Sequence, residues 1–424
     1  MSDPSSGSKP AKSTLPRLLQ GRKGTRLYSI AALVERVVDQ FFSEHGEGSQ
    51  ALQDARTRGQ RLRLLLDSAE YVLAVESVNV TSEDKAEIVS LAYAEVFGYG
   101  PLDSLFADPR ITTIYLNGAR AASVRYGHGE LEAVGPIFED ESHLNRIVRR
   151  LLEDADVNLD AEPGMVETGL QVNDRSVSLT VAMPPYVAHL TADIRVHPPK
   201  KPDFADLIEA EFMTEEAAAL IRQMIDSKYG IAIVGEPETG KTTLMSALLG
   251  LIPDSTETVA VERSAELHPA KTVKSLSVKW SLSQPVSYSE RIVEALGLRP
   301  QLIVLDELRS DEPHMIAPLL DDGILPRMWW SVRGAPDAKR LQSALGMMAR
   351  RAGSAVDESR VLALYERLPF VLSCARIRGK LQLFSIGEWQ SRIDTDYPDL
   401  VLLYQYRDGA ARPTGNQLAR WLDV

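Results

Sequence analysis

The sequence is poor in cysteine. Cys374 is the single cysteine among 424 residues, which excludes a disulfide within the chain and a thiolate metal cluster. The seven histidines are scattered and show no spacing typical of metal ligands. Cys374 lies in the apolar run FVLSCARI, and free cysteines are usually buried, so we expect it to be a packed strand residue.

Long apolar runs are missing as well. No stretch of eighteen apolar residues is present, and the first residues, MSDPSSGSKPAKS, lack the apolar core of a secretory signal. We therefore expect a cytoplasmic protein. The composition, 44% hydrophobic and 25% charged, is typical of a soluble globular chain. The net charge of −12 argues against nonspecific binding of nucleic acid, so no nucleic-acid partner is expected.

The length predicts two or three domains, and changes of pattern mark their borders. A Ser-, Pro- and Gly-rich basic start is followed by apolar residues at helical spacing. Short alternating runs such as ITTIYLNG and SVSLTVAMPP then indicate strands, and HPPKKPD interrupts the pattern. The predicted segments are a disordered basic arm (1–25), a helical region (26–96), an α+β N-terminal domain (97–196), a linker (197–205) and a larger α/β domain (206–424).

The last segment alternates helices with short buried strands. The runs IAIVG, TVAVE, LIVLDE and MWWSV are apolar throughout, with helical patterns such as KTTLMSALLGLI between them. Such alternation predicts a mostly parallel sheet covered by helices. The runs PFVLSCARI and LQLFSIGEW, joined by RGK, predict a terminal β-hairpin.

A phosphate-binding loop follows the first of these strands. The octapeptide GEPETGKT (235–242) matches G-x-x-x-x-G-K-[ST] between a buried strand and an amphipathic helix. Backbone N–H groups and the helix dipole bind phosphate there, Lys241 is predicted to reach the β- and γ-phosphates of ATP, and Thr242 to ligate Mg²⁺. The predicted nucleotide-binding residues of the loop are Gly235, Glu236, Pro237, Glu238, Thr239, Gly240, Lys241, Thr242 and Thr243.

Three residues of the loop are less favourable for a polyanion. Pro237 removes one N–H donor, and the carboxylates of Glu236 and Glu238 would repel phosphate unless they face outward. Position 238 is often glycine in such loops, which makes Glu238 the more doubtful of the two.

Acidic residues end two of the other strands. LIVLDE (302–307) ends in Asp306 and Glu307, where a Walker B strand supplies acids for Mg²⁺ and for orienting the attacking water. TVAVE brings Glu262 to the same predicted edge, where ligands of open α/β sheets bind. An ordinary exposed acid remains an equal explanation for Glu262 alone.

The order of these features resembles the type II/IV secretion ATPase superfamily, and within it the CpaF/TadA-type ATPases of Tad (Flp) pili. The similarity covers about residues 30–390 and includes FGYGPLDSLFADPRITTIYLNG, DAEPGMVETGLQVNDRSVSLTVAMPP and ADIRV. AVERSAEL is similar to the family's Asp box. The resemblance implies a RecA-like P-loop ATPase domain preceded by a smaller α+β domain, in a homohexameric motor that uses ATP and Mg²⁺.

The resemblance also implies roles for single residues. Glu262 would polarise water, Glu307 would be the Walker B glutamate near the γ-phosphate, and Lys241 completes the predicted catalytic set. Thr242, Asp306 and Glu307 would face the metal. Arg175 and Arg195 match family arginines that reach phosphates from the N-terminal domain or a neighbouring subunit, and we expect them to act across a subunit interface.

The chain departs from the family pattern at several positions. Asp306 stands where glycine is usual, and Arg263 replaces the second acid of the Asp box. The family's His box should fall within MWWSVRGAPDAKRL (328–341), which contains no histidine, although Arg333 lies there. Trp329 and Trp330 are expected to pack in the core. These departures favour ATP binding over fast hydrolysis.

Three hypotheses follow. The resemblance implies an ATPase motor that powers pilus assembly or protein secretion through an inner-membrane platform protein, at the cytoplasmic face of that membrane. The altered His box favours a second hypothesis, a hydrolysis-poor ring subunit that binds nucleotide as a structural switch. A generic P-loop kinase or a DNA-translocating ATPase is the third, disfavoured by the N-terminal blocks and the acidic charge.

Overall fold

The computed structural model describes residues 18–20, 27–46, 49–127, 129–157, 164–199, 202–264, 266–267, 272–278, 286–309, 315–320, 325–352, 358–391, 397–420 and 422. The chain divides into two compact units, Met1–Ala107 and Asp108–Val424. Apart from the short strand β1 (Leu18–Gln20), paired with β2 (Leu27–Ser29), the expected basic arm lies outside the described residues. No helix in the described ranges is long and apolar enough to span a membrane.

The first unit is helical, and polar caps set where its helices begin. Ser29 accepts a hydrogen bond from the backbone of Ala32, while Thr57 and Thr81 form capping boxes. Apolar faces of the three long helices, including Leu33, Leu65 and Ile88, form one buried core. The helices are α1 (Ile30–Glu44), α2 (Gln50–Asp54), α3 (Arg58–Val75), α4 (Ser82–Phe97) and α5 (Leu102–Ala107).

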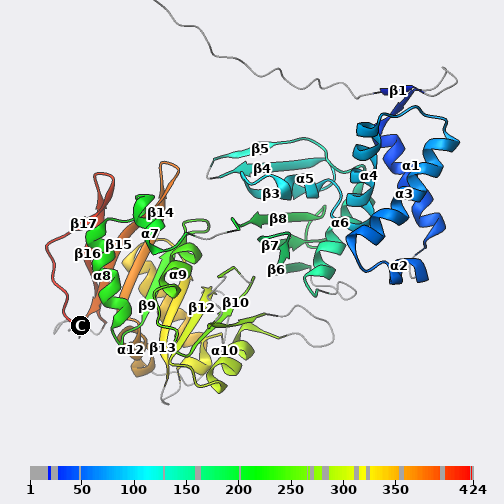
Figure 1. Cartoon of the computed structure of the whole chain (residues 1–424). Helices are drawn as coiled ribbons and strands as arrows, with labels where there is room; N and C mark the ends of the chain where they lie inside the picture. The colour runs from blue at the N-terminus through cyan, green and yellow to red at the C-terminus, as the bar shows by residue number, and fades with distance from the viewer. Residues whose placement is uncertain are drawn as a thin grey trace, which may run out of the picture. The chain divides into compact units, whose positions relative to one another are not determined.

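The second unit begins with a six-stranded antiparallel sheet in the order β5-β4-β3-β8-β7-β6 (Figure 1). Alternation of apolar and polar residues predicted most of these strands. A helix was expected around LNRIVRRLLEDA, where the structure has α6 (Glu141–Asp154), but the edge strand β6 was not expected. The strands are β3 (Ile111–Asn117), β4 (Ala121–Tyr126), β5 (Leu131–Ala133), β6 (Met165–Val172), β7 (Arg175–Ala182) and β8 (Thr191–Val196).

A nine-stranded sheet follows in the order β11-β10-β12-β13-β9-β14-β15-β16-β17, and the predicted α/β fold is confirmed. Its strands β9, β10, β12 and β13 are parallel, as their apolar sequences predicted. The strands are β9 (Ile231–Gly235), β10 (Thr258–Glu262), β11 (Lys274–Ser277), β12 (Leu302–Leu308), β13 (Arg327–Arg333), β14 (Phe370–Ile377), β15 (Lys380–Gln390), β16 (Asp399–Arg407) and β17 (Ala410–Pro413).

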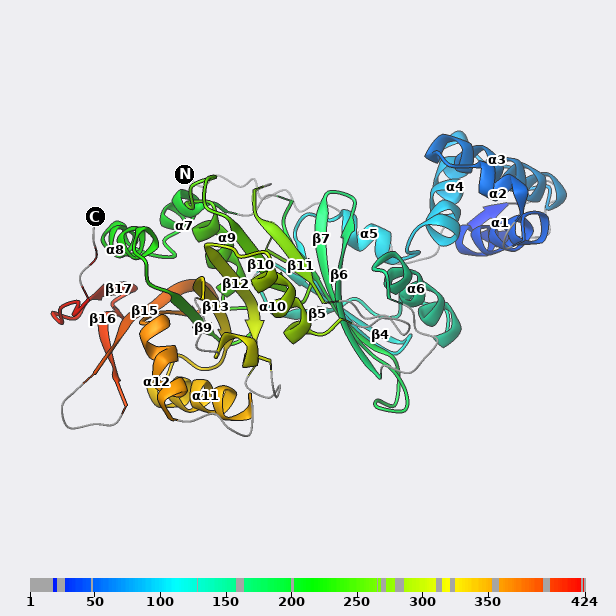
Figure 2. The same cartoon turned by 90° about the horizontal axis from the view of Figure 1, so that it is seen from below.

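Helices cover both faces of this sheet (Figure 2). Alternate residues of β13 point to opposite sides, so Trp329 packs with α7–α9 whereas Trp330 packs with α10–α12. Both tryptophans are fully buried, which confirms their expected core role, and Cys374 is likewise buried. The helices are α7 (Phe204–Glu209), α8 (Glu215–Asp226), α9 (Lys241–Leu249), α10 (Tyr288–Gly297), α11 (Ala338–Arg351) and α12 (Glu358–Arg367).

The expected hairpin is not the end of the sheet. β14 and β15 do pair antiparallel around Arg378 and Gly379, both at positive φ. A second turn at Asp408 and Gly409 then joins β16 to β17, which extend the sheet further. The alternation in DLVLLYQYR and the Asp-Gly turn after it were the signals for this extension.

Candidate nucleotide-binding site

The predicted phosphate loop connects β9 to α9. Gly240 caps the helix at φ +90°, a conformation that glycine adopts without steric cost. A Cβ at Gly235 would lie 2.3 Å from Thr239 Oγ1 and 2.7 Å from the carbonyl of Cys374, so a side chain has no room there. Both glycines are therefore required by the backbone path of the loop.

Lys241 points from the first turn of α9 toward the carboxyl ends of the strands. Its side chain is only 4% exposed, and its Nζ donates to the backbone carbonyl of Glu236 at 2.9 Å. The same nitrogen lies 3.0 Å from Glu307 Oε2. Thr242 and Thr243 line the cavity beside it. The structure thus brings Lys241 and Glu307, the predicted Walker B glutamate, into direct contact although they are 66 positions apart.

Glu307 lies among cations. Arg333 Nε is 2.9 Å from Glu307 Oε1, and Arg309 Nε is 3.8 Å from the same oxygen. Arg333 ends β13, next to the phosphate loop, because Arg333 pairs with Gly235 in the sheet. In the region where the His box was expected, an arginine therefore contacts the predicted Walker B glutamate.

Asp306 has a different environment from Glu307. It is 5% exposed, and among the described residues its Oδ1 has no hydrogen-bond partner. Burial, with the nearby Glu266 carboxylate, raises the pKa of Asp306 to about 7. A buried carboxylate oxygen without a donor is suited to a cation.

The oxygen groups at the strand ends fit Mg²⁺. The orphaned Asp306 Oδ1 lies with Glu307 and the Thr242 hydroxyl along one cavity. Within the described ranges no three His, Cys, Asp or Glu side chains form a metal-binding group. Mg²⁺ in nucleotide sites is usually held by one or two protein groups together with phosphates and water. The residues present therefore fit a Mg²⁺ ion that is bound together with a nucleotide.

Glu262 is engaged in the loop that follows its strand. Its Oε2 accepts a hydrogen bond from the backbone N–H of Leu267 at 2.9 Å, and its Oε1 accepts one from Ser275. It lines the cavity but is 2% exposed. In this structure one carboxylate oxygen of Glu262 holds the Asp-box loop and the other is bonded to β11, and the water-polarising role stays a prediction.

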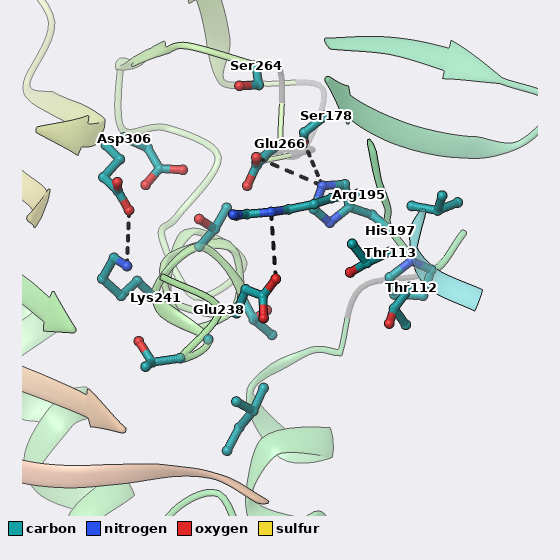
Figure 3. A pocket seen from close by; sticks show the side chains of 18 of the residues that line it. Thr112, Thr113, Ser178, Arg195, His197, Glu238, Lys241, Ser264, Glu266 and Asp306 are labelled. Carbon is teal, nitrogen blue, oxygen red and sulfur yellow. Dashed lines mark hydrogen bonds and ion pairs between the residues drawn. The ribbon is translucent and has the colours of Figure 1, made fainter. Parts of the chain in front are cut away.

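The two predicted arginines lie in different environments. Arg175 is buried, and its guanidinium donates to the backbone carbonyls of Asp108, Ile111 and His197 at 2.8–3.0 Å. Arg195 extends into the cavity, with its Nε 3.9 Å from Glu238 Oε1 (Figure 3). Arg195 thus reaches the phosphate loop of its own chain, and the action of both arginines across a subunit interface stays a prediction.

Other cavity residues were not predicted. Arg125 of β4 and Arg376 of β14 both contact Glu238. His197, after β8, lies 2.8 Å from Ser178 Oγ and 4.0 Å from Glu266 Oε1 (Figure 3). A lone arginine in an otherwise apolar strand was the available signal for Arg125 and Arg376. Their common target depends on the fold.

The cavity itself has a volume of about 730 Å³ and is lined from both sheets. The N-terminal sheet supplies Arg125, Glu167 and Arg195, and the larger domain supplies the phosphate loop and the ends of β10, β12 and β13. An ion pair of 2.5 Å between Arg309 and Glu167 joins the two sides. A cavity of this size, lined by the phosphate loop with its Lys241 and by the acids at the strand ends, suits a nucleoside polyphosphate.

Known proteins share this sequence pattern. Residues 120–318 match the family described as "Type II/IV secretion system protein". The chain is 30% identical over 237 residues to Rv3659c of Mycobacterium tuberculosis, named for conjugal transfer, covering 54% of this chain and 67% of the relative. It is 24% identical over 185 residues to the type IV secretion system protein VirB11 of Bartonella henselae, covering 43% and 52% of the two chains.

Solved structures also align with the chain. The ATPase DotB of Legionella pneumophila is 12% identical with a TM-score of 0.47, covering 68% of this chain and 78% of its own. The pilus retraction motor PilT, solved with ADP, is 13% identical with a TM-score of 0.45, covering 71% and 80%. By its family match and its 30% identity to a relative covered over 67% of its length, the chain belongs to the type II/IV secretion ATPase superfamily.

Proposed function

We propose that the protein binds Mg²⁺–ATP at the phosphate loop and hydrolyses it as the motor subunit of a secretion or pilus system. The observation that carries this proposal is the contact of 3.0 Å between Lys241 and Glu307 inside the cavity. In phosphoryl transfer a P-loop lysine neutralises the β- and γ-phosphates, while a Walker B acid serves the metal or the attacking water.

The chain's own residues suit these tasks. On nucleotide binding, Lys241 would exchange the Glu307 carboxylate for phosphate oxygens, and Glu307 would keep Arg333 as its partner. Thr242 and Asp306 would face Mg²⁺, which neutralises the phosphates when bound. Glu307 would then be free of the lysine and available to orient water.

The Tad-pilus subtype, a homohexameric ring and an inner-membrane platform partner are further parts of this proposal. They come from the resemblance of the N-terminal blocks, including FGYGPLDSLFADPRITTIYLNG, to CpaF/TadA-type ATPases. Such a subunit would work in the cytoplasm, peripheral to the cytoplasmic face of the inner membrane. VirB11 of Bartonella henselae is by its name a type IV secretion system protein, in line with a role in secretion.

A specific observation favours a second candidate, a hydrolysis-poor nucleotide switch. Arg333 occupies the end of β13 and contacts Glu307 at 2.9 Å, so a guanidinium competes with water for the carboxylate expected to orient it. A carboxylate held by a guanidinium is less available to position the attacking water. In this case nucleotide would still bind through Lys241 and would change the protein's conformation or assembly with little turnover.

Turnover and affinity measurements on wild-type protein and Lys241→Ala test the proposal. Loss of a charge-assisted phosphate contact of about 1.5–3 kcal/mol should weaken ATP binding by roughly ten- to a hundredfold. Lys339→Ala removes an exposed lysine of α11 and serves as the charge control. Mg²⁺-dependent phosphate release by wild type supports the motor, and binding without release supports the switch. Equal ATP affinity and turnover of wild type and Lys241→Ala would remove both.

A further inference from the structure

One carboxylate of the phosphate loop faces three arginines. Glu238 has φ +59°, in the left-handed region where residues other than glycine are uncommon, and its side chain is only partly exposed. Its Oε2 contacts Arg125 Nη1, and its Oε1 lies 3.9 Å from Arg195 Nε. Arg376 Nη2 lies 3.8 Å from Oε2 and donates to the Glu238 carbonyl at 3.1 Å.

These arginines come from both sides of the cavity. Arg125 and Arg195 belong to β4 and β8 of the N-terminal sheet, whereas Arg376 belongs to β14 of the larger domain. The four side chains are 17–30% exposed, so solvent screens their contacts less than those of surface ion pairs. The Glu238 carboxylate therefore ties the N-terminal sheet to the phosphate loop.

The cluster has capacity for a further anion. Arg125 Nε is buried, and among the residues that the structure describes it has no hydrogen-bond partner. Arg195 is shared between Glu238 and Asp193, each at 3.9 Å, which leaves its guanidinium loosely held. Three guanidiniums beside a phosphate loop present planar donors that match phosphate oxygens.

We propose that Glu238 is an internal anion that occupies Arg125 and Arg195 in the nucleotide-free site and must give them up to the phosphates of the nucleotide. This inference rests on the proposed function of the loop as an ATP site. Before the exchange, the ion pairs of Arg125 and Arg195 with Glu238 join the N-terminal sheet to the phosphate loop directly. After the exchange, both arginines would contact the loop through the bound phosphates. Glu238 thereby lowers nucleotide affinity and makes the link between the two sides dependent on nucleotide.

The test is the affinity for Mg²⁺–ATP of Glu238→Gln in two backgrounds, wild type and Arg125→Gln/Arg195→Gln. Removing a competing partner of charge-assisted contacts should tighten ATP binding about tenfold in the wild-type background. In the double-arginine background neither Arg125 nor Arg195 remains to be released, so the same substitution should tighten binding by less than about threefold. Titration of a fluorescent ATP analogue measures all four affinities.

Plain repulsion between Glu238 and phosphate gives the opposite pattern. Without Arg125 and Arg195 to neutralise it, the carboxylate would repel ATP more, so Glu238→Gln would tighten binding more in the double-arginine background, and this result would overturn the proposal. So would weaker or unchanged binding in the wild-type background. Glu236→Gln, an exposed carboxylate on the same loop, measures the repulsion of a nearby charge. Glu238→Asn, which tolerates positive φ, replaces the glutamine variant if that one fails to fold.

This experiment distinguishes a failure of the proposed function from a failure of the proposed role of Glu238. If wild-type protein fails to bind ATP, or if Lys241→Ala binds it equally well, the proposed function fails. If ATP binding depends on Lys241 but the four affinities show no coupling between Glu238 and the arginines, only the proposed role of Glu238 is wrong and the proposed function stands.

Discussion

The two acids at the end of β12 differ in their surroundings although they are adjacent in sequence. Glu307 contacts Lys241 and Arg333, whereas Asp306 is buried with one oxygen lacking a hydrogen-bond partner among the described residues. A paired carboxylate on the cavity side can release its cation and orient water, and a buried one can serve a metal. We therefore assign them different roles at the residue scale.

Glu307→Gln should separate binding from hydrolysis. An acid that orients water acts mainly on the transition state, so ATP affinity should stay within a few-fold while turnover falls by roughly 10²–10⁴. Titration of an ATP analogue and a phosphate-release assay measure the two effects. Asp306→Asn and Glu262→Gln are the comparison variants. An active Glu307→Gln beside an inactive Glu262→Gln would move the water-positioning role to Glu262.

Asp306 should make the stability of the metal-free protein depend on pH. Its pKa is raised to about 7, above the ordinary 3.8, so the folded state holds a proton that the unfolded state releases. The free energy of unfolding therefore falls as pH rises from about 4 to 7. Asp306→Asn cannot release this proton, so its free energy of unfolding should not fall in this way. The free energy of unfolding of Asp306→Asn relative to wild type should therefore rise by roughly 2–4 kcal/mol between pH 4 and pH 8.

Urea denaturation with a metal chelator at the two pH values measures this difference. Asp254→Asn, which changes an exposed aspartate, is the control for a general effect of charge. A constant difference between wild type and Asp306→Asn across the range would show that Asp306 is ionised in the folded protein.

At the scale of elements, β6 lies against the loop after β10. A Cβ placed on Gly169 of β6 would lie 1.9 Å from the carbonyl oxygen of Ser264, so only glycine permits this approach. The contact connects the N-terminal sheet to the Asp-box loop, next to Glu262. The close approach of β6 to this loop thus requires a residue without a Cβ at position 169.

Gly169→Ala should push β6 away from this loop. Overpacking of this kind costs about 1–3 kcal/mol, and the arginines of the same sheet should reach the phosphate loop less well. We expect a lower melting temperature and ATP affinity weakened several-fold. Gly297→Ala, where no atom lies within 4 Å of the new Cβ, is the matched control. Unchanged melting and affinity in Gly169→Ala would mean that the loop moves without cost.

At the scale of the whole molecule, the site is already provided with arginines from its own chain. Arg195 and Arg125 reach the phosphate loop through Glu238, and Arg175 is held by backbone carbonyls. The action of these arginines across a subunit interface, which the resemblance to the secretion ATPases implies, stays a prediction. The ring itself is likewise a proposal.

We expect Mg²⁺–ATP to favour a homohexamer. If nucleotide replaces the Glu238 tie, the N-terminal sheet changes its contact with the larger domain, and ring assembly should respond. Mass measurement in solution at tens of micromolar, without nucleotide, with an ATP analogue and with the analogue plus a Mg²⁺ chelator, tests this. A monomer under all three conditions contradicts the ring, although ATP binding could persist.

The sequence alone determined the parallel core and the phosphate loop, because both depend on local patterns. Buried strands such as IAIVG and LIVL are apolar throughout. The motif G-x-x-x-x-G-K-[ST] between a strand and a helix is typical of phosphate binding. The burial of Cys374, Trp329 and Trp330 followed from the same apolar runs. Several neighbouring residues of the same element indicate each of these features, so the sequence specifies them strongly.

Only the tertiary structure decided which distant charges meet. Arg125, Arg195 and Arg376 lie on three strands of two sheets, and nothing in their local sequence identifies Glu238 as their common partner. The same holds for Arg333 beside Glu307 and for Gly169 beside Ser264. Secondary structure follows from periodicity along the chain. Ion pairs and close backbone approaches depend instead on how the sheets pack against each other, and this packing cannot be inferred from the local sequence around a single residue.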